Sequence, residues 1–205
     1  ESAAYFGFQC DSKRIQSELE ARSGAWSGPQ RVSLSLERDG SLVLDAEPLP
    51  PSAIHLGLKL AEEPADSSDR FLYHKTTRRE VYDRERARLG EADDAVLFNE
   101  RGEVTETTIA NIAFLIDGEW VTPPVSSGLL PGVLRGRLIE SGQLKEQVVT
   151  ISEARDASSI LVLSALRVEI PATWAVFIAP KSPCPSVQQH EPLMQTPPRT
   201  SDKRL

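Results

Sequence analysis

Hydrophobic and polar positions alternate with a period of two along two stretches near the start of the chain. The alternation over residues 31–49 continues on both sides of Arg38-Asp39-Gly40, a turn sequence, and this pattern predicts a β-hairpin. The alternation over residues 53–61 predicts a further strand. Before the hairpin, residues 10–24 place apolar positions four apart behind the N-cap candidate Asp11, which predicts a short amphipathic helix.

After residue 75 the spacing switches between helical and strand-like patterns. A helix is predicted over residues 76–90, and short apolar runs separated by glycine turns predict a β-meander over residues 94–123. Glycine and proline then open a second predicted helix, residues 128–142. The last predicted elements are strands over residues 147–151 and 158–166, with a short helix over residues 152–157 between them.

The polar segment around Pro64 has no hydrophobic period, so it is interpreted as a linker. We expect a small N-terminal α+β domain over residues 1–62, a linker over residues 63–70, and a larger α+β domain over residues 71–178. A site is expected in the cleft between the two domains. Residues 179–205 hold six of the fifteen prolines and show no period, which predicts a disordered tail.

Composition excludes several classes of function. A net charge of −7 argues against a nucleic-acid or anionic-membrane partner. The absence of a long apolar run and of a signal peptide predicts a cytoplasmic protein without membrane helices. The cysteines and histidines lack the spacing of metal ligands, so no metal site and no disulfide are expected. These residues are Cys10, Cys184, His55, His74 and His190.

Lys75 is the first candidate for chemistry, because it follows a short apolar segment and precedes Arg78 and Arg79. Taken alone, a lysine in these surroundings is more often a solvated surface residue. A reactive amine has to be neutral at the working pH, and burial and neighbouring cations both lower a lysine pKa. Such a lysine can form a Schiff base with a carbonyl compound. The adjacent His74 is expected to point to the opposite side, as a packing or surface residue.

Glu106 is the second candidate, within the strand-like sequence EVTETTI. Taken alone it is more often an exposed strand carboxylate, although it shares a face with Val104, which is unusual for a carboxylate. The third candidate is the predicted helix start at Gly132, because free N–H groups at a helix start bind anions such as phosphate. Many helices begin in this way, and Arg135 and Arg137 inside the helix could be surface charges.

The order of these three signals resembles the class IV aminotransferase family, which has pyridoxal-phosphate fold type IV. HKTTRREVYD resembles the lysine motif of this family, and LFNERGEVTETTIANIAFLIDGEWVTPP resembles its signature. SSGLLPGVLRGRLI and ILVLSALRVEIPA resemble its two phosphate-binding segments. The resemblance covers about residues 2–172. It implies a two-domain α+β fold of the D-amino-acid aminotransferase type, here with a truncated N-terminal domain, and pyridoxal 5'-phosphate as cofactor.

The resemblance also implies roles for individual residues. Lys75 matches the catalytic lysine that forms a Schiff base with the cofactor and then takes the Cα proton of the substrate. Glu106 matches the acid that pairs with the pyridine nitrogen of the cofactor and keeps it protonated. The residues that match the phosphate-binding segments are Gly132, Val133 and Leu134 at the helix start, and Ser164 and Ala165 in the second loop.

Within the family, the motifs SAAYFGFQCD, HKTTRR and NERGEVTETTIAN are most similar to 4-amino-4-deoxychorismate lyases, in particular to lyase domains fused behind aminodeoxychorismate synthase component I. This implies conversion of aminodeoxychorismate to 4-aminobenzoate and pyruvate in folate biosynthesis. It further implies a homodimer that is fused to, or works with, a synthase domain. One alternative is a branched-chain or D-amino-acid aminotransferase of the same fold. The other is a catalytically incompetent fragment of a fusion protein.

The chain also departs from the family pattern. It begins at Glu1, its only methionine is Met194, and residues 1–8 are typical of the end of a helix whose beginning is absent. An arginine that pairs with the phosphate in the family is expected upstream of this segment. After Pro171 the likeness fades. We therefore expect a piece of a longer protein, with weakened cofactor binding.

Overall fold

The structure is a computed structural model of the chain, and it describes residues 1–175. The predicted disordered tail, residues 179–205, lies outside the described residues, as do the last positions assigned to the larger domain.

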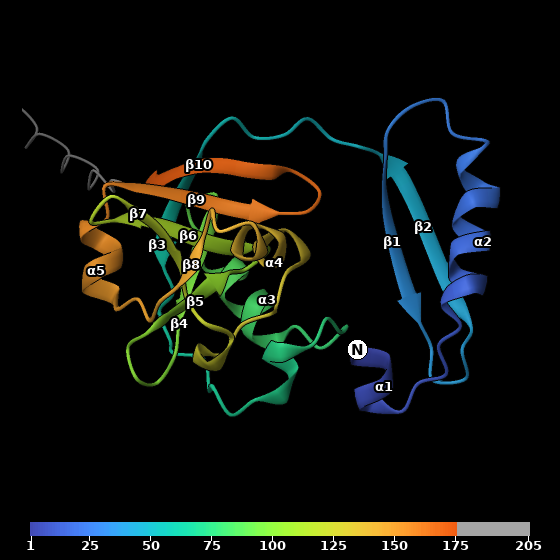
Figure 1. Cartoon of the computed structure of the whole chain (residues 1–205), viewed down its shortest axis with the longest axis horizontal. Helices are drawn as coiled ribbons and strands as arrows, with labels where there is room; N and C mark the ends of the chain where they lie inside the picture. The colour runs from blue at the N-terminus through green and yellow to red at the C-terminus, as the bar shows by residue number, and fades with distance from the viewer. Residues whose placement is uncertain (176–205) are drawn as a thin grey trace, which may run out of the picture. The chain divides into compact units, whose positions relative to one another are not determined.

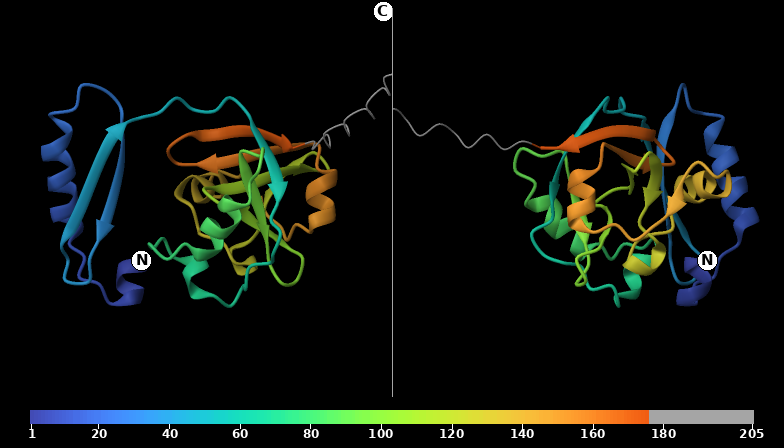
Figure 2. Two further views of the ribbon diagram at one scale, coloured as in Figure 1. Left: turned by 180° about the vertical axis from the view of Figure 1, so that it is seen from behind. Right: turned by 60° about the vertical axis from the view of Figure 1, so that its left-hand side comes forward.

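The chain begins with two helices and a hairpin (Figure 1). The short helix α1 spans Ser2–Phe6, and α2 spans Ser12–Ser23. The side chain of Asp11 accepts hydrogen bonds from two backbone N–H groups in the first turn of α2, at 3.0 and 3.1 Å, so the predicted N-cap is confirmed. Strands β1, Gln30–Leu36, and β2, Leu42–Pro48, pair antiparallel, which confirms the predicted hairpin. Helix α2 runs alongside this hairpin (Figure 2).

The other strands form a curled sheet of eight, in the order β5-β4-β3-β10-β9-β6-β7-β8. Strand β3 pairs parallel with β4 and β10, and β7 pairs parallel with β8, whereas the remaining pairs are antiparallel. The strands are β3 Leu56–Leu60, β4 Asp94–Phe98, β5 Val104–Thr107, β6 Asn111–Ile116, β7 Glu119–Thr122, β8 Lys145–Glu146, β9 Ser159–Ser164 and β10 Val168–Trp174. The helices are η1 Arg70–Tyr73, α3 Glu80–Ala87, η2 Val125–Ser127, α4 Val133–Glu140 and α5 Ile151–Asp156, where η denotes a 3₁₀ helix.

The position of β3 corrects the predicted boundary between the domains. Residues 56–60 were expected in the small N-terminal domain, but they form an interior strand of the large sheet. Residues 63–70, expected as a linker, pack against the same sheet. The backbone N–H of Ala65 donates to the carbonyl of Phe98 at 2.8 Å, and the Ser67 hydroxyl donates to a Glu100 oxygen at 2.6 Å. The larger sheet therefore begins at Leu56.

The hydrophobic core is divided by the alternation of side chains along each strand. On β6, Ile112 and Phe114 are fully buried in the main cluster, which also includes residues of α5. Ala113, between them, packs in a second cluster with side chains of α4. On β4, Leu97 belongs to a third cluster together with Tyr82 of α3. Helices α3 and α4 are thus held on the sheet by apolar contacts, and this fixes where their first turns lie.

Helix α3 is shorter than the sequence predicts. It begins at Glu80, although a helix was expected from about residue 76. The hydroxyl of Thr76 accepts a hydrogen bond from the backbone N–H of Arg78 at 3.2 Å. Such a local side-chain turn competes with helix formation. Lys75 consequently lies in an irregular segment between η1 and α3.

Replacement of Phe114 by Ala should show how far the fold depends on the main cluster. The side chain is fully buried, so Phe114→Ala should lower the free energy of unfolding by about 3–5 kcal/mol through lost burial and a cavity. Val43→Ala on β2, where the side chain is 50% exposed, should change it by less than about 0.5 kcal/mol. Urea denaturation followed by circular dichroism measures both. Equal losses for the two variants would contradict this description of the core.

Candidate active site

Glu106 lies on β5 with only 4% of its surface exposed. Its Oε1 accepts hydrogen bonds from the Tyr82 hydroxyl at 2.8 Å and from the Leu130 N–H at 3.2 Å. Its Oε2 accepts one from Nδ2 of Asn111 at 3.1 Å. The interpretation of Glu106 as an exposed strand carboxylate is therefore wrong, and this side chain is held from three directions.

Burial raises the pKa of Glu106 from 4.5 to about 7. The hydrogen bonds from Tyr82 and Leu130, and the positive charges of Lys75 and Arg79, act in the opposite direction but do not offset the desolvation. The protein itself therefore does not fully compensate the cost of a negative charge on the buried Glu106 side chain. A cationic N–H partner would stabilise its ionised form.

Tyr82 on α3 is a site residue that the sequence analysis missed. Burial, followed by the neighbouring Glu106 carboxylate, raises the pKa of its hydroxyl, which keeps the proton needed for donation. The Arg79 guanidinium lies 4.7 Å from the centroid of the Tyr82 ring and donates to the carbonyl of Thr108 at 2.8 Å. This arginine ties the segment before α3 to the residue that follows β5.

Lys75 lies near this carboxylate, since its charge lowers the pKa of Glu106. Lys75 is exposed, whereas the reactive-lysine hypothesis expected it to be buried. The neighbouring cation of Arg78 is engaged elsewhere. Its guanidinium lies 4.4 Å from the Phe71 ring centroid and pairs with Glu80 at 3.4 Å. The lysine is thus placed at the site with an amine open to solvent.

His74 has the packing role that was expected for it. Its ring lies 4.2 Å from the ring centroid of Tyr5 and 5.1 Å from that of Phe6, and its Nδ1 lies 3.2 Å from the hydroxyl of Ser2. These contacts join α1 to the segment that carries Lys75.

The start of α4 lies beside Glu106. Gly132 is the N-cap residue, and no side chain caps the first turn of this helix. Val133 is exposed, whereas Leu134 packs against the sheet in the cluster that contains Leu163 of β9. The N–H groups of this first turn therefore have no side-chain acceptor and are suited to an anion.

Ser164 and Ala165, predicted in the second phosphate loop, end β9 and enter the turn before β10. Residue Leu163 of β9 pairs with Asn111 of β6, whose side chain contacts Glu106. The turn is therefore at the same end of the sheet as the acid and the start of α4. Glu106, the start of α4 and this turn thus lie at one end of the sheet, and Lys75 is close enough for its charge to act on Glu106.

Arg135 is not a surface charge, in contrast to one interpretation of the sequence. It is 3% exposed, and its Nη2 donates to the carbonyl of Pro123 at 2.8 Å and to Glu146 at 2.5 Å. Arg135 therefore anchors α4 to the end of β7 and to β8. Arg137 is exposed, as expected.

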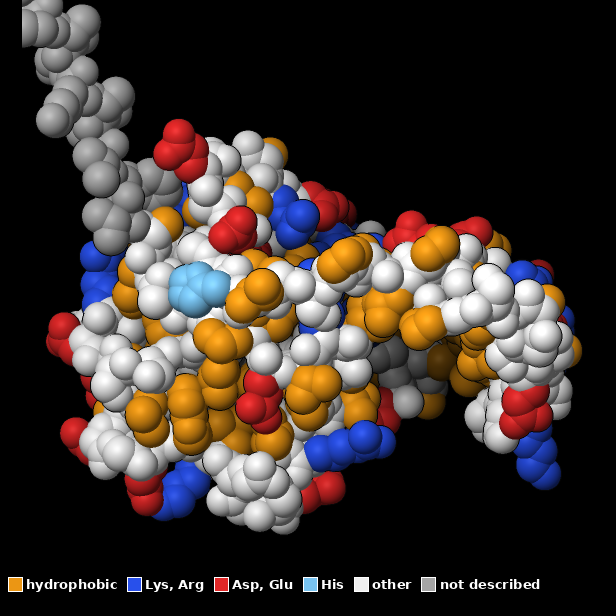
Figure 3. Space-filling view, turned by 90° about the horizontal axis from the view of Figure 1, so that it is seen from above, with side chains coloured by type: hydrophobic (Ala, Val, Ile, Leu, Met, Phe, Trp, Pro, Cys, Tyr) orange, Lys and Arg blue, Asp and Glu red, His pale blue; other side chains and the backbone are white. Residues whose placement is uncertain are grey.

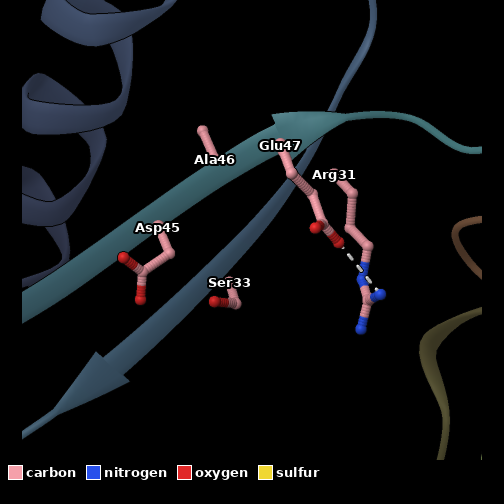
Figure 4. Close-up of a pocket in the computed structure, with 5 residues that line it drawn as sticks. All are labelled: Arg31, Ser33, Asp45, Ala46 and Glu47. Carbon is pink, nitrogen blue, oxygen red and sulfur yellow. Dashed lines mark hydrogen bonds and ion pairs between the residues drawn. The ribbon is translucent and has the colours of Figure 1, made fainter.

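Other features of the described residues do not add to the site. A shallow depression on the hairpin is lined by Arg31, Ser33, Asp45, Ala46 and Glu47 (Figure 4), and none of the site residues reaches it. Its exposed Arg31–Glu47 ion pair, at 3.1 Å, is an ordinary surface interaction. Within residues 1–175 no cluster of His, Cys, Asp and Glu is suited to a metal ion, and no helix has the length and hydrophobicity to span a membrane.

Hydrophobic side chains also lie on the surface. Figure 3, which views the molecule from above, shows them in patches between charged residues. Large apolar side chains that are exposed next to the strands of the large sheet include Ile54 before β3 and Leu166 in the turn before β10, and Val168 is exposed at the start of β10.

Known proteins are similar to this chain both in sequence and in fold. A Schizosaccharomyces pombe protein, provisionally named aminodeoxychorismate lyase, is 34% identical over 101 residues, which are 46% of this chain and 44% of that protein. The chain thus spans less than half of this relative. The crystal structure of a Mesorhizobium loti protein, provisionally named amino-acid aminotransferase, is 37% identical with a TM-score of 0.79, over 85% of this chain and 86% of that one.

More distant structures share the fold. The 4-amino-4-deoxychorismate lyase of Pseudomonas aeruginosa is 16% identical with a TM-score of 0.71, over 83% of this chain and 72% of that one. Branched-chain aminotransferases are also among the similar structures, and one of them was solved in its pyridoxal-phosphate form. The α+β fold expected from the sequence motifs is confirmed.

The family model described as "Amino-transferase class IV" matches residues 1–174, nearly all of the described chain. Together with the shared fold, this match shows that the chain belongs to the class IV aminotransferase family.

Proposed function

We propose that the chain is a pyridoxal-phosphate-dependent lyase that converts 4-amino-4-deoxychorismate to 4-aminobenzoate and pyruvate. The observation that carries the proposal is the buried carboxylate of Glu106, which lies near Lys75 and next to the uncapped start of α4. The name of the Schizosaccharomyces pombe relative supports the choice of substrate. The motif resemblance to lyase domains supports it independently.

The residues of the site fit pyridoxal phosphate. A buried carboxylate with a raised pKa gains from a protonated ring nitrogen, which would neutralise its charge without solvent. When bound, the cofactor supplies an electron sink for the negative charge that develops at the substrate Cα. The groups that would hold its phosphate are the backbone N–H groups of Gly132, Val133 and Leu134 and the turn at Ser164 and Ala165.

The chain's own residues then have distinct tasks. Lys75 would hold the cofactor through its Nζ, and its free amine would accept the Cα proton of the substrate. Glu106 would keep a proton on the ring nitrogen, and the donors Tyr82 and Asn111 hold its carboxylate in one orientation. Loss of pyruvate leaves an aromatic ring, which makes this direction of the reaction favourable.

An aminotransferase of the same fold is the second candidate, favoured by the Mesorhizobium loti protein at 37% identity. It would pass the amino group to a 2-oxo acid instead of releasing pyruvate. The third candidate is a fragment without activity, since the chain matches less than half of one relative. For the lyase we further expect a homodimer, and a synthase domain in the same or a partner chain as the source of the substrate.

Product analysis separates the lyase from the aminotransferase. With pyridoxal phosphate, aminodeoxychorismate and no added 2-oxo acid, the protein should release pyruvate and 4-aminobenzoate in equal amounts. A lactate dehydrogenase assay measures the pyruvate, and Lys75→Ala is the inactive control. Turnover that appears only after a 2-oxo acid is added would instead support the aminotransferase. No turnover, with no change in the cofactor spectrum, would support the inactive fragment.

Borohydride reduction in the presence of pyridoxal phosphate should fix the cofactor on Lys75, as peptide mapping by mass spectrometry can show. Lys59 and Lys145 are internal controls. Nζ of Lys59 donates to the carbonyl of Arg88 at 2.8 Å, and Lys145 pairs with Glu119. Stoichiometric labelling of either control lysine, with Lys75 unlabelled, would show that the assignment of the catalytic lysine is wrong.

The ligand-free protein should lose stability as Glu106 ionises. Its pKa is higher in the folded protein, about 7, than the ordinary value of 4.5, so the folded state binds the proton more tightly. The tighter binding of this proton contributes fully to the free energy of unfolding below about pH 4.5, and this contribution is lost as the pH rises through about 7. Relative to Glu106→Gln, the free energy of unfolding should fall by about 3 kcal/mol across this window. Urea titrations at several pH values measure this difference, and a flat difference would contradict the raised pKa.

A further inference from the structure

Asn111, the first residue of β6, joins the acid to the loop that precedes α4. It is 6% exposed, and its Nδ2 donates both to Oε2 of Glu106 at 3.1 Å and to the carbonyl of Leu130 at 2.8 Å. The N–H of Leu130 in turn donates to Oε1 of Glu106 at 3.2 Å. These three hydrogen bonds form a closed ring, so displacement of any one member displaces the other two.

The same amide limits the start of α4. A Cβ built on Gly132 would overlap Oδ1 of Asn111, and its next nearest neighbours are Cγ of that amide at 3.2 Å and Nδ2 at 4.0 Å. The φ of Gly132 is −68°, which any residue adopts. Glycine is therefore required at this position for space, because the backbone of the N-cap residue lies directly against the Asn111 amide.

The hydrogen bonds also distinguish the two oxygens of Glu106. Each oxygen of an ionised carboxylate has two lone pairs. Oε1 accepts from both Tyr82 and Leu130, whereas Oε2 accepts only from Asn111 among the described residues. Oε2 is therefore the oxygen with capacity for the N–H of a ligand, and Asn111 is the residue that holds it.

We propose that Asn111 is a positioning residue that holds the Glu106 carboxylate and the N-cap of α4 in one fixed relation, so that the groups for the ring nitrogen and for the phosphate cannot move independently. This inference rests on the proposed binding of pyridoxal phosphate for its functional meaning. The coupling itself is a property of the ligand-free protein.

A double-mutant cycle tests the contact between Asn111 and Gly132. Asn111→Ala removes the bridge, and Gly132→Ala introduces a methyl group into the amide. Each change should weaken pyridoxal phosphate binding about tenfold or more, measured by absorbance titration, since each disturbs a charge-assisted contact. In the double variant the methyl group enters the vacated space, so the affinity should be close to that of Asn111→Ala alone. An affinity loss equal to the product of the two single losses would overturn the proposal.

Asn99 provides a matched control for the loss of a buried asparagine. It is 1% exposed, and its Nδ2 donates to Glu103 at 2.8 Å and to the carbonyl of Ser127 at 2.9 Å. Like Asn111, it donates to one carboxylate and to one backbone carbonyl of the loop between β7 and α4. Unlike Asn111, it does not contact Glu106. Asn99→Ala should lower the melting temperature while changing cofactor affinity less than about twofold.

The ionisation of Glu106, followed by carbon-13 NMR of labelled glutamate in the ligand-free protein, tests the coupling without the cofactor. Glu106→Gln identifies the signal. The charged and titratable groups around the carboxylate are Lys75, Arg79 and Tyr82, and none of them is altered. Both Asn111→Ala and Gly132→Ala should raise the pKa of Glu106 further, because donors to its charged form are lost or displaced, whereas Asn99→Ala should leave it unchanged.

The outcomes distinguish the two proposals. If the wild-type protein does not bind pyridoxal phosphate but the pKa of Glu106 responds as described, the proposed function fails and the coupling stands. If Asn111→Ala only lowers the melting temperature, as Asn99→Ala does, and leaves the pKa of Glu106 unchanged, then Asn111 has no positioning role.

Discussion

The arrangement of the site depends on the burial of one carboxylate, which requires hydrogen-bond donors around it. Glu106 is 4% exposed, and the removal of its charge from water raises its pKa to about 7. A group in this position is stable only if its oxygens are hydrogen-bonded. The donors come from three separate elements, Tyr82 on α3, Asn111 on β6 and the backbone of Leu130 before α4. The packing of α3 and α4 on the sheet therefore also determines the state of this acid.

Two asparagines with parallel roles attach one loop to the edge of the sheet. Asn99 binds Glu103 at the beginning of β5 and the carbonyl of Ser127, and Asn111 binds Glu106 near the end of β5 and the carbonyl of Leu130. The segment between β7 and α4 is thereby fixed at two points to the strand that carries the acid. Long loops are usually mobile, but this one is built into the site. The start of α4 is positioned by these contacts as much as by its own helical propensity.

The candidate residues of the site could be predicted from the sequence, but the side chains that contact Glu106 and the boundary of the large sheet could not. The order of Lys75, Glu106 and the glycine-proline helix start was sufficient to indicate the family, and the N-terminal hairpin follows from alternation. The meander expected over residues 94–123 is wrong, because β4 pairs with β5 and β6 pairs with β7, but β5 and β6 are not neighbours in the sheet. Tyr82 could not be found, because it is 24 residues from its partner Glu106 and no local period encodes this contact. Asn111 is only five residues from Glu106 and lies within the signature segment, but strand alternation does not predict a hydrogen bond between their side chains. The boundary of the large sheet was misplaced for a similar reason. The alternation in residues 53–61 indicates a strand, but its parallel partners β4 and β10 are remote in sequence.

The pairing of β3 with β10 has a consequence for the order of folding. Without β10 the sheet falls into two separate groups, β5-β4-β3 and β9-β6-β7-β8, and nothing else in the strand order connects them. Strand β10 spans Val168–Trp174, more than 100 residues after β3. Contacts across such a separation form slowly, because the loop entropy is lost before the contacts are made. During synthesis on the ribosome, the N–H and C=O groups on the edges of β3 and β9 that face β10 therefore stay unpaired until β10 has emerged.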